Sequence, residues 1–387
     1  MAEVLSNEEI DQLLIAINAE SDTETRRPDK FSGEQIKAIS YIHETFANLT
    51  TYSLSTHIRS MCHLHVLSIN QYTYEEFIRL FPLFATLAVI NMNPLKGSVI
   101  LGIDKKITFT IIDRICGGFG DGTKFHHELT DIETSIMDNI IVHILGNLRE
   151  AWNQVLDIHP QVKRIDNATQ YVRIVSPNET VISVTLKTKI GEVEGIIGIC
   201  IPCPTIEPVM EKLSNWYWNK NQDNTPSTSS AEEKPAEEKS EHIPKENERK
   251  NFRSFDYLNR VDPNDLSNLI QWEHPQIIAL VLAHMEADKA SAVLQNILHD
   301  IQSDVFRRIA TMDNVKLEIA SEIERILENK LIELSADKKN YSEVGGVESA
   351  AEILNQADQY AKKSIIDELE KVFPELAEEI QKRAEMI

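Results

Sequence analysis

The chain has 387 residues, of which 42% are hydrophobic and 26% charged, as expected for a globular protein of two or three domains. A net charge of −22 argues against non-specific binding to nucleic acid or anionic lipid, because both require a basic surface. We find no signal-peptide pattern and no apolar stretch long enough to cross a membrane. These features, with four cysteines expected to be reduced, predict a cytosolic protein that only a partner could hold at a membrane.

Residues 1–19 predict a short amphipathic helix. Ser6 and Glu9 have the spacing of a capping box, in which each side chain bonds to the backbone of the other residue. The apolar residues that follow fall on one helical stripe: Ile10, Leu13, Leu14 and Ile17. Because residues 20–30 are polar and indicate a tether, we expect a docking peptide, with packing onto its own domain as the alternative.

Residues 31–218 predict one α/β domain. Helical patterns cover residues 33–60 and 129–156. Segments rich in β-branched residues predict strands at 98–103, 170–176, 179–188 and 192–201. The next segment, 219–252, is nearly free of apolar residues and rich in Ser, Glu, Lys and Pro, so it predicts a disordered linker.

Residues 253–387 predict a small all-α domain of stacked helices. Helical patterns run through the segment, and strand patterns are missing. Pro263 and Pro275 each stand where a helix is expected to begin, since the missing amide of proline is tolerated in the first turn.

The sequence offers no convincing catalytic or metal site, and it predicts no cofactor. Cys62, His63 and His65 are close in sequence but match no common zinc spacing. Residues 63–69 alternate like a strand, which sends neighbouring side chains to opposite faces. Nucleophile-elbow, HExxH and Walker patterns do not occur.

The densest glycine run is CGGFGDG at residues 116–122. A phosphate-binding loop would follow a strand, but Ile107, Ile111, Ile112 and Ile115 precede this run at helical spacing. Gly117 is therefore expected to end a helix with positive φ. The further glycines indicate a bare backbone surface that another element approaches closely.

Several segments in residues 1–218 resemble the flagellar motor switch protein FliM. They are LSNEEIDQLL (5–14), TYEEFIR (73–79), NPLKGSVILGIDKK (93–106), IDRICGGFG (112–120) and IPCPTIEPVMEKL (201–213). The resemblance implies a three-layer α/β/α fold built from two related halves. It also implies that the N-terminal peptide binds the phosphorylated response regulator CheY through Leu5, Ser6, Glu9, Ile10, Asp11, Leu13 and Leu14.

Residues 253–387 resemble a second switch protein, FliG, in its armadillo-like middle domain. The resemblance is carried by residues 255–294, which contain the EHPQ motif, and by GGVESAAEILN at 345–355. In the families, the GGxG loop of FliM and the EHPQ patch of FliG lie against each other. The implied interface residues are Gly117, Gly118, Phe119, Gly120, Trp272, Glu273, His274, Pro275 and Gln276.

The two resemblances together imply a non-enzymatic component of the switch ring, or C-ring, at the flagellar basal body on the cytoplasmic face of the inner membrane. The implied partners are phosphorylated CheY and the FliG and FliM subunits of the ring. Binding of FliN is not implied, because in FliM proteins a C-terminal domain binds FliN, and here the linker begins where that domain would stand. A passive scaffold without sensing is the alternative. A phosphatase related to the CheC family ranks below it, because Glu44 with Asn48 and Glu133 with Asn139 lack the ExxN spacing.

Overall fold

A computed structural model describes residues 30–79, 84–120, 127–166, 172–223, 255–340, 346–357 and 359–384. The chain forms two compact units, the first ending at Ile326 and the second beginning at Leu327. The predicted N-terminal docking peptide and most of the predicted linker lie outside the described residues. The first unit contains the α/β domain and also the first helices of the all-α segment.

One six-stranded sheet with the order β1-β5-β6-β3-β2-β4 forms the centre of the α/β domain, and every neighbouring pair is antiparallel. β1 and β4 are therefore its edge strands. The strands are β1 (Cys62–Thr73), β2 (Phe84–Asn93), β3 (Ser98–Asp104), β4 (His159–Asp166), β5 (Thr180–Ile190) and β6 (Val193–Pro202).

The strand order relates two halves of this domain. Exchanging β1 with β4, β2 with β5 and β3 with β6 turns the order into its own reverse. A long helix precedes the first strand of each half, and both helices begin with a capping box, at Ser32 and at Thr130. The helices of the first half are α2 (Gly33–Ile58), α3 (Tyr74–Ile78) and α4 (Lys105–Ile115), and those of the second are α5 (Asp131–Trp152) and α6 (Cys203–Ile206). The fold class expected from the sequence is confirmed in this α/β architecture.

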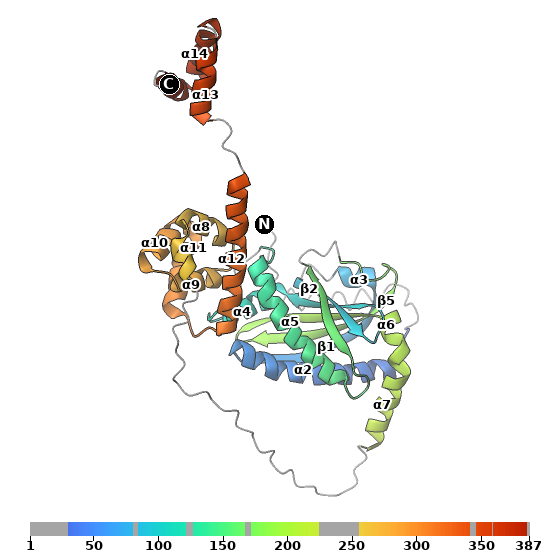
Figure 1. Cartoon of the computed structure of the whole chain (residues 1–387). Helices are drawn as coiled ribbons and strands as arrows, with labels where there is room; N and C mark the ends of the chain where they lie inside the picture. The colour runs from blue at the N-terminus through green and yellow to red at the C-terminus, as the bar shows by residue number, and fades with distance from the viewer. Residues whose placement is uncertain are drawn as a thin grey trace. The chain divides into compact units, whose positions relative to one another are not determined.

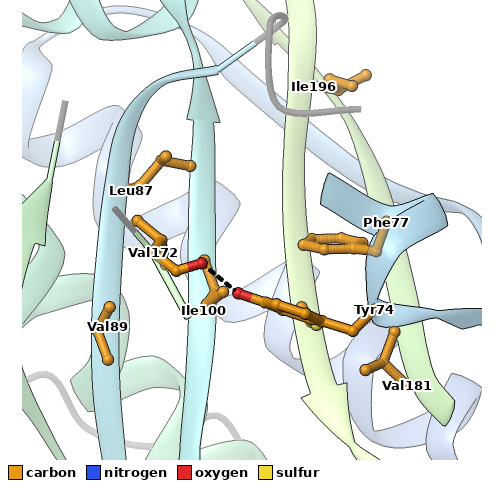
Figure 2. Close-up of a cluster of buried hydrophobic side chains, with 9 residues drawn as sticks. Tyr74, Phe77, Leu87, Val89, Ile100, Val172, Val181 and Ile196 are labelled. Atoms are coloured by element: carbon orange, nitrogen blue, oxygen red, sulfur yellow. Dashed lines mark hydrogen bonds between the residues drawn. The ribbon is translucent and has the colours of Figure 1, made fainter. Parts of the chain in front are cut away.

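Helices cover both faces of the sheet (Figure 1). On one face, α3 and the segment after β4 enclose an apolar cluster, and the Tyr74 hydroxyl donates to the carbonyl of Val172 at 2.6 Å (Figure 2). Alternate strand residues contribute to this cluster: Leu87, Val89, Ile100, Val181, Ile196 and Cys200. On the other face, α2, α4 and α5 contact one another, and the sheet residues beneath them, such as Ile197 and Ile199, are equally buried.

A helix crosses residue 218, the predicted end of the α/β domain. A 3-10 turn (Glu207–Val209) leads into α7 (Met210–Asp223), which packs on α2. The Trp216 ring meets the Tyr41 ring edge-on, and the Lys220 ammonium lies 4.2 Å from the centre of the Tyr41 ring. This packing keeps the first residues of the predicted linker, up to Asp223, in the helix.

The strand predictions need two corrections. The predicted strand at 170–176 is wrong for its described residues, since none of residues 172–176 pairs in the sheet. Val172 packs into the apolar cluster instead, which accounts for its apolar character without a strand. The sequence also failed to predict β2 and β4, which pair with each other.

The all-α segment begins with a short 3-10 turn (Asp256–Arg260). The helices that follow are α8 (Pro263–Ile270), α9 (Pro275–Ala283), α10 (Ala287–Asn296), α11 (His299–Thr311) and α12 (Leu317–Asn340). Asp262 caps α8 by accepting from the Asn264 amide, and Pro263 and Pro275 occupy first turns as predicted. α9 is buried along nearly its whole length, so it forms the core of this segment.

The second unit has a small core of its own. Ala351, Leu354, Ile366 and Ile380 form that core. They come from the last three helices, α13 (Gly346–Gln356), α14 (Gln359–Val372) and α15 (Pro374–Ala384). Throughout the described part of the chain, each helix is too short or too polar to span a lipid bilayer.

Candidate protein-contact site

The glycine turn, which we define as residues 116–120, follows α4. The helix ends at Ile115 with Cys116 as its C-cap, and Gly117 then adopts φ +85°, as the sequence predicted. Gly120 also has positive φ, at +91°. The Gly118 amide donates to the carbonyl of Asp113 at 2.8 Å, which folds the turn back onto the helix. The glycines therefore end a helix and do not follow a strand, so a nucleotide loop is not formed.

The three glycines of this turn meet different neighbours. A Cβ on Gly117 would lie 2.7 Å from the Asp313 carbonyl oxygen and 3.0 Å from Val315 Cγ2, atoms of the all-α segment. The Gly117 carbonyl accepts from the Asp313 amide at 2.9 Å. A Cβ on Gly118 would instead meet the carboxyl group of Asp113 within its own turn. Gly117 is thus the residue that permits backbone-to-backbone approach.

Gln276 and Arg308 connect the helical segment to the end of α4. The Gln276 side-chain amide donates to the Cys116 carbonyl at 3.0 Å, and its oxygen accepts from Arg308 at 2.9 Å. Arg308 also forms ion pairs with Asp113 and with Asp304. Asp113 is fully buried, and its second oxygen accepts from the Gly120 amide at 2.5 Å. Removing Arg308 would leave Asp113 buried without its cation, which is strongly destabilising.

Glu273 and His274 pack against the start of α5. The Thr130 hydroxyl donates to the carboxylate of Glu273. His274 caps α9 by accepting from the Gln276 amide at 3.1 Å, and its ring stacks on Phe109 of α4 with 6.0 Å between centroids. Burial, followed by the positive charge of Arg308, lowers the pKa of His274 well below 6.5. This histidine is therefore neutral in the contact.

We call this arrangement the glycine-turn contact. It is formed by Asp113, Cys116, Gly117, Thr130 and Glu133 on the α/β side and by Glu273, His274, Gln276, Arg308 and Asp313 on the helical side. Further bonds lie at its margin, where Arg59 donates to the Asn314 carbonyl at 2.9 Å and Ser135 donates to Glu322 at 2.6 Å. Beside them is a cavity of about 250 Å³ that His57, Arg114, His143 and Lys316 help to line.

Two of the predicted interface residues are exposed. Phe119 is 61% exposed and Trp272 is 65% exposed. Glu273, His274, Pro275 and Gln276 are buried rather than presented at the surface. Three of them bond or stack with the α/β side of the same chain: Glu273, His274 and Gln276. The predicted regulator-binding residues, Leu5 to Leu14, lie outside the described residues.

Sequence reasoning missed several participants. Arg308 lies 195 residues after Asp113, and nothing in its local pattern indicates a buried cation. Thr130 and Glu133 could have been found from the sequence as a helix start, since they have the capping-box spacing. Asp113 gives a weaker indication of a buried charge, because it is an acidic residue among the apolar residues at the end of α4.

The residues first considered for a zinc site lie on opposite sides of β1. His63 and His65 lie on the exposed side of β1, while Cys62 is buried on the other side. Cys200 and Cys203 have a C-x-x-C spacing that the sequence reading overlooked, but both are buried free thiols whose pKa is raised by burial. Within the described ranges no three potential metal ligands come together.

Comparison with known proteins identifies two kinds of relative. The family described as "Flagellar motor switch protein FliM" matches residues 32–218, and "FliG middle domain" matches residues 263–338. FliM of Treponema pallidum (strain Nichols) is 52% identical over 234 residues, covering 56% of this chain and 68% of that protein. FliM of Bacillus subtilis (strain 168) is 38% identical, covering 62% of this chain and 74% of that protein.

The FliG relatives match a shorter part of the chain. FliG of Bacillus subtilis (strain 168) is 43% identical over 131 residues, which cover 34% of this chain and 38% of that protein. A solved structure described as a FliG-FliM complex from H. pylori is 31% identical and has a TM-score of 0.46. That match covers 47% of this chain and 100% of that chain.

Proposed function

Because the chain belongs to the FliM family of flagellar motor switch proteins and also carries a FliG middle domain, we propose that it works in the switch ring and relays changes in rotation direction. The relay would pass through the glycine-turn contact, from the FliM-like domain to the FliG-like helices. The proposed place is the cytoplasmic face of the inner membrane, and the proposed partners are FliM and FliG subunits of the ring.

The observation that supports a relay is the kind of bonding across the contact. The bonds join rigid elements, the end of α4 and the starts of α5 and α9, with buried charges and backbone groups. Such groups tolerate little displacement, because a buried polar atom that loses its partner costs about 1–3 kcal/mol. The contact should therefore be either closed or open, which is what a directional switch needs.

The first test measures the contact in the full chain with paired spin labels. All four native cysteines are buried, so labels on Lys37→Cys and Asp300→Cys, both at exposed positions, should react selectively. We expect one narrow distance distribution. Gly117→Val should broaden it, because a side chain would strain the positive φ and collide with Asp313, at a cost of about 1–3 kcal/mol each.

Two further variants serve as a control and as an independent way to open the contact. Gly146→Ala is the matched control, since a Cβ there meets no atom within 4 Å. Gln276→Ala should open the contact from the helical side, because it removes the bond to the Cys116 carbonyl while the sequence of the glycine turn stays unchanged. A narrow distribution that survives in both Gly117→Val and Gln276→Ala, with thermal unfolding unchanged, would rule out the contact as the coupling element.

We also propose that residues 1–19 bind the phosphorylated response regulator CheY. The support is the apolar stripe of Ile10, Leu13 and Leu14 beside the acidic Glu9 and Asp11. Titrating the full chain with CheY should give tighter binding of the phosphorylated form, and Leu13→Asp should weaken it at least tenfold. Equal affinity for both forms would leave the passive scaffold as the better description.

The phosphatase alternative has no support in the described residues. Glu133 is fully buried in the glycine-turn contact, where it cannot position an attacking water at the surface. Glu44 is exposed but bonds to Ser40 of its own helix.

A further inference from the structure

Two carboxyl groups, one from each side of the glycine-turn contact, meet at the same threonine. The Thr130 amide donates to Glu133 at 2.9 Å, and the Thr130 hydroxyl donates to Glu273. Glu133 is completely buried and Glu273 is 4% exposed. This inference rests on the contact proposed above and concerns what regulates it.

Two buried carboxylates at such close range repel each other, and burial disfavours the charged form of each. Burial, the main cause, and the charge of Glu273 together raise the pKa of Glu133 to about 8. The amides of Thr130 and His274 act in the opposite direction, but burial outweighs them. At neutral pH the closed contact therefore contains a protonated Glu133.

Other charged and titratable groups surround the pair from each neighbouring element. His127, in the segment before α5, places Nδ1 3.7 Å from the Glu133 carboxylate. Asp113 at the end of α4 pairs with Arg308 of α11, and Arg308 pairs in turn with Asp304. Cys116 is a buried thiol whose pKa is raised by burial, so it stays neutral.

We propose that closing the glycine-turn contact takes up one proton, held at the Glu133–Glu273 pair, so that the contact weakens as the pH rises. When the contact opens, Glu133 becomes exposed to water and returns to an ordinary carboxyl group, which is ionised at neutral pH. At Glu133 the closed form thus binds one proton more than the open form between pH 4.5 and pH 8.

The sign of this dependence follows from the raised pKa. From pH 6.5 to pH 8, the closed-to-open ratio should fall by up to about tenfold for each pH unit of increase. Above pH 8 both forms are ionised, and the ratio should become constant. His274 sets the acid limit, because its pKa is lowered in the closed form and below pH 6.5 only the open form binds a proton there. That proton offsets the one at Glu133, so the ratio should be nearly level from pH 6.5 down to pH 4.5 and should change most steeply between pH 6.5 and pH 8.

The experiment uses the spin-labelled full chain in the Gln276→Ala background, where a partly open contact makes the closed fraction sensitive to pH. Measured from pH 6.5 to 9, the closed-to-open ratio should fall at least tenfold and level off above pH 8. Glu133→Gln should abolish that fall, because Gln remains neutral and can still complete the capping box. Its closed fraction at pH 8.5 should equal that of the parent at pH 6.5.

Two further variants define the outcome. Glu128→Gln, at an exposed position close in sequence, should keep the full pH dependence. Glu273→Gln should move the midpoint to lower pH, because the charge that helps to raise the Glu133 pKa is gone. A closed population with no pH dependence overturns the proton uptake but leaves the contact standing, whereas no closed population in the unsubstituted labelled chain overturns the contact itself.

Discussion

At the scale of single residues, His43 shows how a polar side chain is held in the core of the α/β domain. It is fully buried on α2, hydrogen-bonds the Ile39 carbonyl at 2.8 Å, and meets the rings of Phe46 and Trp152 edge-on. Burial lowers its pKa to about 4. The imidazole is therefore neutral at physiological pH and acts as a packing residue with one internal bond.

This burial predicts a loss of stability in acid. The unfolded chain protonates His43 near pH 6.5 while the folded chain resists until about pH 4, so stability falls as the pH drops through that interval. At pH 5 the loss from this residue should be about 2 kcal/mol relative to pH 7.5. Urea unfolding followed by tryptophan fluorescence at both pH values measures it.

His43→Leu should remove that part of the acid sensitivity, although it lowers stability at pH 7.5 through the lost hydrogen bond. His65→Gln, on the exposed side of β1, is the control and should leave the pH dependence unchanged. If His43→Leu loses as much stability between pH 7.5 and 5 as the unsubstituted chain does, another group causes the effect.

At the scale of elements, α4 depends on a glycine in β6 for its position. A Cβ on Gly195 would lie 2.7 Å from Ile107 Cγ1 and 3.1 Å from Asp104 Cγ. Asp104 is the N-cap of α4 and accepts from the Lys106 amide at 2.7 Å. The strand therefore leaves room for both the cap and the first turn of the helix that carries the glycine turn.

Gly195→Ala should destabilise the domain by about 1–3 kcal/mol, because one extra methyl overpacks this junction. Gly33→Ala provides a matched comparison, since a Cβ at the start of α2 meets nothing within 4 Å. That control should be neutral or stabilising by up to about 1 kcal/mol. Urea denaturation curves of the two variants decide the point, and equal midpoints would refute the packing argument.

Elements with a strong periodic pattern were predictable, and those governed by tertiary pairing were not. The long helices and strands β3, β5 and β6 follow their local patterns within a few residues. β4 is a largely polar edge strand with half of its side chains in water, so its sequence gives little sign of pairing. Val172, Ile174 and Val175 are β-branched but pack with α3 in the apolar cluster, without strand partners.

At the scale of the whole molecule, the sequence predicted at most one member of each bonded pair that joins the two sides of the contact. The glycines and the EHPQ motif stand out in the sequence, yet Gly117 rather than Gly118 approaches the helical segment. The partners Arg308 and Asp313 lie far from Asp113 and Gly117 along the chain. Local patterns carry no information about such pairings, because a buried ion pair depends on the tertiary fold that brings its members together.

The two-half strand order bears on how many contact surfaces the α/β domain offers. The architecture is that of a duplicated unit, and each half places a helix directly after its last strand. After α4 the first half has its glycine turn, whereas after α6 the second half continues into a 3-10 turn that contains Pro208. Only one of the two equivalent ends is thus adapted for close backbone approach. Among the described residues, a nearly symmetric domain with one adapted end offers a single such surface and acquires a polarity that its sheet alone does not have.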